Sequence, residues 1–156
     1  MKRRLALPLL ISLLLPACVS TKMSNEFEMT KKEALTPPGL EYLPQSYGIS
    51  PAVRSGGFLF LSGVIGQTNG RAATTPDEEF ELAWLQIRST LEYAGASTAD
   101  IVEIVSFHTD PNSIAAFSTA KDRYIQAPHP TWTAIGVSWL AVPGARAEIK
   151  VVAKAP

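Results

Sequence analysis

Cysteine is almost absent from this sequence: Cys18 is the only one among 156 residues, so no disulfide can form within the chain. Basic residues are not in excess either, because 14 lysines and arginines are matched by 14 aspartates and glutamates. A nucleic-acid backbone requires a basic patch, so nucleic acid is not an expected partner. Because no disulfide can form, the fold must be stabilised by its apolar core alone.

Several motifs of catalysis and cofactor binding are also missing. The sequence contains no glycine-rich phosphate loop, no serine-nucleophile elbow and no closely spaced pair of cysteines. The two histidines, His108 and His129, have no recognised ligand spacing to Asp110 or Glu148, and we expect them to be structural or solvated. We therefore predict neither a metal site nor a cofactor.

A short apolar run opens the chain, although no run reaches the roughly 20 residues that a bilayer-spanning helix needs. Basic residues 2–4 precede apolar residues 5–17, a pattern typical of a secretory signal peptide. The end of this run, Leu-Pro-Ala-Cys at 15–18, resembles a bacterial lipobox, in which Cys18 would be lipidated and become the mature N-terminus. The alternative is an ordinary secretory signal followed by an incidental cysteine.

Lipidation of Cys18 would decide where the protein resides. Two or more acyl chains give stable anchoring, so we expect a protein of the bacterial cell envelope that is held to the membrane by lipid and faces the periplasm or the exterior. Loss of Lys2, Arg3 and Arg4 with the signal leaves 11 basic against 14 acidic residues, a net charge of −3.

The rest of the chain divides into a tether and one domain. Residues 18–40 comprise the lipidated cysteine and a polar stretch that ends in Thr-Pro-Pro-Gly at 36–39, which we interpret as a flexible tether. Residues 41–156 have the length of a single domain.

The first half of this domain predicts two strands and a helix. Residues 47–54 and 58–67 are expected strands, joined by a glycine turn. In the second strand, Phe-Leu-Phe-Leu at 58–61 is apolar at every position, which favours a central strand covered on both faces. Thr75, Pro76 and Glu78 form a capping box, so a helix should begin there and end at Gly95.

The second half predicts a strand, a helix and a closing hairpin. Residues 100–109 alternate as a strand, and Asn112 can cap a second helix that ends before Pro128. Strands over 131–142 and 145–152 would be neighbours, joined by a tight turn at Pro143-Gly144. Two amphipathic helices can cover one face of such a sheet, so we expect the other face to be buried between copies of the chain.

The last predicted strand combines core and polar residues. Side chains alternate along a strand, so Ala147, Ile149 and Val151 share one face while Arg146, Glu148 and Lys150 share the other. A carboxylate flanked by two cations can be an ordinary solvated face, or it can belong to a site.

Several segments, in this order, resemble the Rid family of reactive-intermediate deaminases, also described as endoribonuclease L-PSP-like proteins. These are Ser-Pro-Ala-Val-Arg at 50–54, Phe-Leu-Phe-Leu-Ser-Gly at 58–63, Leu-Glu-Tyr-Ala-Gly-Ala at 91–96, Pro-Thr at 130–131, Val-Pro-Gly at 142–144 and Ala-Glu-Ile at 147–149. The resemblance implies an α+β fold of the chorismate-mutase type, with ββαβαββ order, a mixed sheet and two helices on one face. It also implies a homotrimer with ligand clefts between subunits, and cofactor-independent hydrolysis of enamines or imines to a ketone and ammonia.

The resemblance assigns roles to particular residues. Glu148 matches the family glutamate that orients water and is the expected catalytic residue, while backbone groups near Ser62 and Gly63 would hold the substrate. Trp132 stands where the deaminases carry an arginine that clamps the substrate carboxylate; an indole has one donor and no charge, so activity on 2-iminopropanoate is not expected. Trp132 could stack on a ligand or pack at an interface. Arg146 could bind an anionic ligand or simply pair with Glu148.

Two hypotheses of function follow. The first is an envelope-anchored Rid-type hydrolase of a small imine or enamine, working at a cleft between subunits. The second is a tethered trimer that binds a small molecule and has lost the reaction. A purely structural envelope protein is a third possibility, which the family position of Glu148 disfavours.

Overall fold

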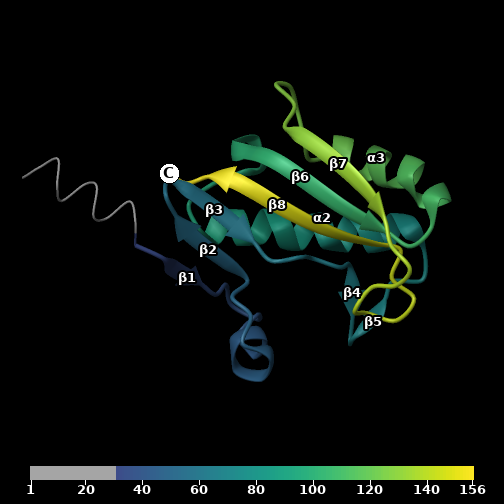
Figure 1. Cartoon of the computed structure of the whole chain (residues 1–156), viewed down its shortest axis with the longest axis horizontal. Coiled ribbons are helices and arrows are strands. Elements are labelled where there is room, and N and C mark those ends of the chain that lie inside the picture. The colour runs from purple at the N-terminus through teal and green to yellow at the C-terminus, as the bar shows by residue number, and fades with distance from the viewer. Residues whose placement is uncertain (1–30) are drawn as a thin grey trace, which may run out of the picture.

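The computed structural model describes residues 31–156, so the predicted signal peptide and the predicted lipidation site at Cys18 lie outside the described residues. Its centre is a six-stranded mixed sheet (Figure 1). The strands are β1 (Glu33–Leu35), β2 (Ala52–Ser55), β3 (Phe58–Leu61), β6 (Ile101–His108), β7 (Thr131–Gly136) and β8 (Ala147–Lys154). A separate two-stranded ribbon consists of β4 (Gln67–Thr68) and β5 (Arg71–Ala72). The helical segments are η1 (Leu43–Tyr47), α2 (Pro76–Tyr93), η2 (Thr98–Asp100), η3 (Pro111–Ser113) and α3 (Ile114–Asp122).

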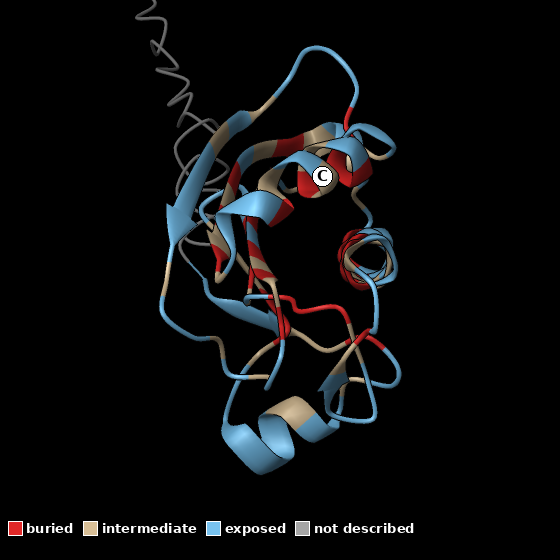
Figure 2. Ribbon diagram, turned by 90° about the vertical axis from the view of Figure 1, so that its right-hand side faces the viewer, coloured by how far each residue is buried: buried red, intermediate tan, exposed pale blue. Residues whose placement is uncertain are grey.

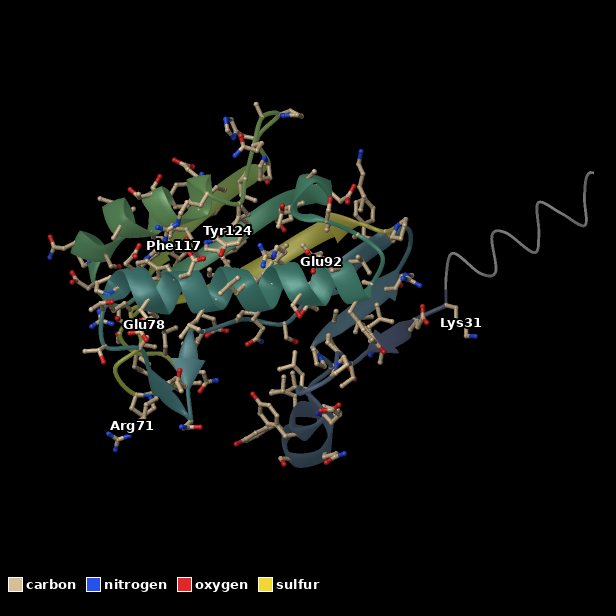
Figure 3. All side chains as sticks on the ribbon, turned by 180° about the vertical axis from the view of Figure 1, so that it is seen from behind. Lys31, Arg71, Glu78, Glu92, Phe117 and Tyr124 are labelled. Carbon is tan, nitrogen blue, oxygen red and sulfur yellow. The ribbon has the colours of Figure 1, made fainter. Side chains whose placement is uncertain are left out.

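The sheet has the order β1-β2-β3-β8-β6-β7, and only β6 and β7 run parallel. Both long helices cover the same face of the sheet (Figures 1 and 3). The predicted α+β class with a mixed sheet and two main helices on one face is therefore confirmed. No helix within residues 31–156 has the length and apolarity to span a membrane.

Helix α2 begins where the capping pattern predicts. The Thr75 hydroxyl oxygen accepts the backbone N–H of Glu78, and Gly95 follows the last turn with a φ of +80°, a left-handed conformation that suits glycine. Its apolar stripe of Phe80, Trp84 and Ile87 is fully buried. Figure 2 shows α2 end-on, with its buried side towards the sheet.

The core lies between the helices and the inner face of the sheet. Strand β8 alternates as expected: Ala147, Ile149 and Val151 are buried, whereas Glu148 is half-buried and Lys150 exposed. From the helix side, Phe117 of α3 packs edge-on against Phe80, with ring centroids 5.5 Å apart. Phe117 lies where α2 and α3 meet (Figure 3).

The predicted hairpin at Pro143-Gly144 is wrong. Strand β7 ends at Gly136, residues 137–146 form a loop, and β8 pairs with β3 and β6 rather than with β7. The reason is that β7 finds a parallel partner in β6, which lies between β7 and β8 in the sheet. Pro143-Gly144 therefore lies within a long loop and does not join two neighbouring strands.

The tether predicted over residues 18–40 extends too far towards the domain. Residues 33–35 form β1, which pairs antiparallel with β2 through Glu33 opposite Arg54 and Leu35 opposite Ala52. The Arg54 guanidinium also donates to the Glu33 carboxylate at 2.9 Å. The structured unit therefore begins before residue 41.

Two further boundaries differ from the prediction. Residues 43–47 form a π-helical turn, so the first predicted strand begins only at Ala52. Asn112 does not cap the second long helix, because the N-cap residue of α3 is Ser113. The preceding η3 is capped by Asp110, whose carboxylate accepts the backbone N–H of Asn112.

The face of the sheet away from the helices remains open. Phe58, Phe60 and Ile135 are 39%, 43% and 39% exposed on it. Strand β3 is central in the sheet, but residues 31–156 cover it on one face only. This apolar surface, with the half-buried Phe107 between Phe60 and Ile135 in strand order, is called the open face below.

Candidate functional site

Glu148 lies on the open face at the start of β8, directly opposite Phe107 of β6. Its carboxylate reaches over Gly63: a Cβ on Gly63 would lie 1.7 Å from Oε1 of Glu148. Only glycine leaves room for the carboxylate in this position. The structure thus brings together Glu148 and Gly63, which the sequence analysis had assigned to one site.

A backbone bridge holds the two residues in place. Val64 and Ile149 exchange two N–H to carbonyl hydrogen bonds, both 2.9 Å long. Ser62 is fixed by its own contacts, since its hydroxyl donates to the carbonyl oxygen of Ser50 at 2.8 Å and its N–H donates to Pro51 at 3.0 Å. The glycine and the carboxylate are therefore positioned by rigid neighbours on both strands.

Burial raises the pKa of the Glu148 carboxyl above its usual value, because the charged form loses hydration against the sheet. Within residues 31–156, no hydrogen bond and no cation contributes to this shift. A desolvated carboxylate with a raised pKa is a stronger base than an ordinary surface glutamate, and it has oxygen atoms free to accept from water.

Trp132 does not share this face. In the sheet, Trp132 is paired with the buried Ile104 of β6, so its side chain points towards the helices. Glu148 is paired with Phe107, which is also paired with Ile135 on the open face, so Glu148 points away from the helices. The Trp132 indole packs on Phe117, with ring centroids 5.5 Å apart, and its Nε1–H donates to Ser106 at 2.8 Å. Within one chain, the indole and the carboxylate cannot border the same pocket.

Arg146 does not pair with Glu148 either. Its guanidinium donates to Glu79 of α2 at 2.8 Å and to the carbonyl oxygens of Ala73 and Thr74. Glu79 is fully buried, and it also accepts the backbone N–H groups of Arg146 and Ala147. Arg146 therefore fixes the start of α2 to the start of β8, so its guanidinium is already occupied within the chain.

His108 is a residue whose importance the sequence analysis missed. It is buried, as a structural histidine should be, and Nε2 lies 2.8 Å from the Ser106 hydroxyl. Burial lowers its pKa below the usual value. The alternation of Ile104, Ser106 and His108 along β6 was the available signal, because it places all three on the helix side of the sheet. Within the described residues, no cluster of three or more His, Cys, Asp or Glu could hold a metal ion.

Known proteins resemble this chain over nearly its whole described length. It is 40% identical over 134 residues to the RutC family protein YjgH of Escherichia coli K12, covering 82% of this chain and 98% of that protein. The solved structure of protein YJGH superposes with a TM-score of 0.73 at 38% identity, covering 81% of this chain and 98% of the other. A 2-iminobutanoate/2-iminopropanoate deaminase of Dermatophagoides farinae is 29% identical over 128 residues, covering 80% of this chain and 97% of the mite protein.

The fold itself is shared more widely. A YjgF/YER057c/UK114 family member from Mycobacterium tuberculosis superposes with a TM-score of 0.68 at 22% identity, covering 80% of this chain and 99% of the other. Residues 44–155 match the family model described as endoribonuclease L-PSP. The chain therefore belongs to the endoribonuclease L-PSP family, which is the YjgF or Rid family.

Proposed function

We propose that this protein is a cofactor-independent hydrolase of small imines or enamines, in which Glu148 orients and deprotonates the attacking water. The observation that carries the proposal is the half-buried Glu148 carboxylate above Gly63, with its raised pKa and without a hydrogen-bond or ion-pair partner among residues 31–156. The likeness to the mite deaminase, whose name states an imine substrate, supports the same reaction type.

The reaction needs one carboxylate and one water molecule. Glu148 accepts a proton as the water oxygen bonds to the imine carbon and passes that proton to the imine nitrogen, which gives a carbinolamine. Glu148 then transfers the proton of the carbinolamine hydroxyl to the amine nitrogen, so the C–N bond breaks, ammonia leaves and the oxygen becomes the carbonyl oxygen. An enamine first takes a proton on carbon to become the imine. General-base assistance of this kind accelerates a reaction by about 10²–10⁴-fold.

We propose that the cleft is completed by a second copy of the chain in a homotrimer. The open face, on which Glu148 lies, also exposes Phe58, Phe60 and Ile135, and apolar surface of this kind is normally covered in a stable protein. Burial of that face between subunits would enclose Glu148, Gly63 and Ser62 and exclude bulk water. If Trp132 borders the same cleft, a neighbouring subunit has to supply it.

The substrate is expected to lack a carboxylate. The family resemblance places Trp132 at the position of the arginine, and Arg146 is engaged with Glu79. A 2-imino acid would find no guanidinium beside Glu148, and loss of such a contact costs about 1.5–3 kcal/mol in binding. Backbone groups near Ser62 and Gly63 are left to hold the neutral substrate.

The test is ammonia release from freshly generated imines, one series with a carboxylate and one without. The wild-type protein should accelerate hydrolysis of uncharged imines, and Glu148→Gln should lose the acceleration. Thr68→Ala, at an exposed position on β4, is the matched control and should keep it. Hydrolysis at the buffer rate by the wild-type protein would reject the proposal.

A second candidate is a trimer that binds a small molecule without turnover. The observation favouring it is that Trp132, in place of the clamping arginine, is held inside the chain by Ser106 and Phe117. If the protein binds a ketone but releases ammonia from imines no faster than buffer does, the second function would be favoured over the first.

We also propose that the protein is lipid-anchored through Cys18 in the bacterial envelope. The support is the signal-like residues 5–17 followed by a lipobox-like segment. Mass spectrometry of the membrane-extracted protein should show an N-terminal cysteine that carries acyl chains. A free thiol on an unprocessed chain would contradict it.

A further inference from the structure

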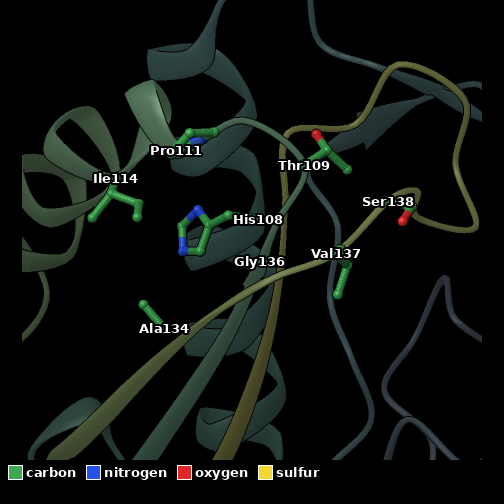
Figure 4. A pocket seen from close by; sticks show the side chains of 8 residues that line it. All are labelled: His108, Thr109, Pro111, Ile114, Ala134, Gly136, Val137 and Ser138. Carbon is green, nitrogen blue, oxygen red and sulfur yellow. The ribbon is translucent and has the colours of Figure 1, made fainter.

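A cavity of about 370 Å³ opens where β6 and β7 end, beside η3 and the start of α3 (Figure 4). Ile114, Ala134 and Val137 contribute apolar side chains to it, and His108, Thr109 and Ser138 contribute polar ones. None of its lining residues is Asp, Glu, Lys or Arg. The cavity is large enough for a small molecule and lacks the charge that an ionic ligand would need.

A chain of four hydrogen-bonding side chains leads into the wall of this cavity. The Trp132 Nε1–H donates to Ser106 Oγ at 2.8 Å, and Ser106 Oγ lies 2.8 Å from Nε2 of His108. On the other side of the ring, Nδ1 lies 3.4 Å from Ser113 Oγ, whose proton is donated to the carbonyl oxygen of Asp110 at 2.7 Å.

The direction of these bonds fixes the tautomer of His108. An indole nitrogen can only donate, so Ser106 accepts from Trp132. Nε2 of His108 is the one other hydrogen-bond partner of the Ser106 hydroxyl among residues 31–156, so the hydroxyl proton is directed to Nε2. Ser113 has already given its proton to Asp110, so it can only accept from Nδ1. The ring is therefore neutral, with its proton on Nδ1 and its lone pair on Nε2.

This tautomer leaves one weakly engaged donor beside the cavity. The contact from Nδ1 to Ser113 is at the long end of the hydrogen-bond range, so an acceptor atom of a ligand could take it over at little cost. Nδ1 faces η3, the segment whose Pro111 also lines the cavity, and Figure 4 shows the imidazole among the lining side chains. Thr109 can only accept, because its hydroxyl proton goes to Ala145 at 2.9 Å. Ser138 adds a hydroxyl at an exposed position.

We propose that this cavity binds a small uncharged carbonyl or imine compound through the Nδ1–H of His108, and that Trp132 is a positioning residue that fixes the His108 tautomer through Ser106. A carbonyl oxygen or imine nitrogen is the acceptor that this donor requires, and a carboxylate has no cation to pair with there. The lowered pKa of the buried imidazole keeps the ring uncharged near neutral pH. Binding at this cavity needs neither Glu148 nor turnover, so a negative hydrolysis assay leaves it standing.

The tautomer and the ligand can be followed together by ¹⁵N NMR of the histidine side chains. The chain has only two histidines, and the exposed His129 is an internal reference that His129→Gln identifies. The His108 nitrogens should report a proton on Nδ1. Cyclohexanone should shift the Nδ1 signal saturably, whereas pyruvate should not. A proton on Nε2, or no response to cyclohexanone, would overturn the proposal.

Two variants separate cavity binding from positioning. Gly136 lines the cavity, and a Cβ there would meet nothing within 4 Å, so Gly136→Val should fold, keep the tautomer and weaken cyclohexanone binding about tenfold or more. Ala134→Leu fills the same space if Gly136→Val fails to fold. Trp132→Phe keeps the ring packing but removes the N–H, and it should yield a mixture of tautomers and weaken binding about five- to tenfold. Unchanged binding in both cavity variants would reject the site, and an unchanged tautomer in Trp132→Phe would reject the positioning role.

Discussion

The carboxylate of Glu148 occupies the space that a side chain on Gly63 would need. The Cβ of any other residue at position 63 would lie 1.7 Å from Oε1 of Glu148, whereas the φ angle of Gly63 itself is not in the left-handed region. The glycine is therefore required by the neighbouring carboxylate and not by its own backbone. This relationship ties two segments more than eighty residues apart into one site.

Gly63→Ala should separate function from stability. The methyl group displaces the end of a flexible side chain, so the free energy of unfolding should change by less than about 1 kcal/mol, while imine hydrolysis should fall at least about tenfold. Urea unfolding and ammonia release measure the two effects. Retained hydrolysis would show that the position of the carboxylate above Gly63 is irrelevant to turnover.

Glu148→Gln should stabilise the protein while removing its activity. A carboxyl whose folded pKa is raised keeps its proton at a pH at which the unfolded chain has lost it, so the free energy of unfolding decreases as the pH rises above the usual value of 4.5. The amide has no such charge, and stability at pH 7 should increase by roughly 0.5–1 kcal/mol. A less stable Glu148→Gln protein at pH 7 would mean that the carboxylate is well solvated or paired.

The sequence predicted those elements whose signals are local. Thr75, Pro76 and Glu78 define the start of α2, and the alternation of Ala147, Ile149 and Val151 defines the buried side of β8. In α2 and β8 the residues that determine the structure are neighbours in the sequence. The proximity of Glu148 to Gly63 was predicted in another way, because the family resemblance assigns both short motifs to one site.

Predictions that depended on partners distant in sequence failed. Pro143-Gly144 has the composition of a tight turn, but β7 pairs with β6 and leaves residues 137–146 as a loop. Trp132 was expected to stack on a ligand or to pack at an interface, and no local pattern predicted that Ser106, 26 residues earlier, holds its indole on the helix side. Residues 33–35 are too few to predict β1 from the sequence, and this strand exists because β2 offers it a free edge.

Glu79→Ala should be strongly destabilising. The buried carboxylate accepts the backbone N–H groups of Arg146 and Ala147 and binds the Arg146 guanidinium, so its removal leaves several donors without a partner. We expect a loss of about 2–4 kcal/mol in urea unfolding. Glu78→Ala, at the exposed neighbouring position, should cost less than about 1 kcal/mol. Equal losses in the two variants would contradict the role of Glu79.

His108 should make the fold sensitive to mild acid. Its folded pKa lies below the usual 6.5, so as the pH falls below 6.5 the unfolded chain binds a proton that the folded chain does not, and the free energy of unfolding decreases. One such proton contributes at most about 1.4 kcal/mol per pH unit. His108→Gln should flatten this slope between pH 6.5 and mild acid, and His129→Gln should not. The slope is measured by urea unfolding over that range, and an unchanged slope in His108→Gln would refute the assignment.

Phe60→Glu should prevent self-association. Phe60 is 43% exposed on the open face, and a charge there would have to be buried if copies of the chain meet through this face. Sedimentation should give a trimer for the wild-type protein and a monomer for Phe60→Glu. Tyr93→Glu places the same charge on the 53% exposed Tyr93, at the end of α2, and should leave the trimer intact. A wild-type monomer, or a trimer in Phe60→Glu, would rule out this interface.

The pairing of Glu33 with Arg54 determines how the domain would be oriented if the protein were attached to a surface through its N-terminal segment. Strand β1 begins beside the Ser55–Phe58 turn and the end of β8, whereas Glu148 and His108 lie where β8 begins and β6 ends (Figure 1). The segment that precedes Lys31 is therefore joined to the end of the sheet that lies farthest from Glu148 and from the His108 cavity. If a surface held that segment, Glu148 and the His108 cavity would face away from the surface and would be accessible to compounds in solution.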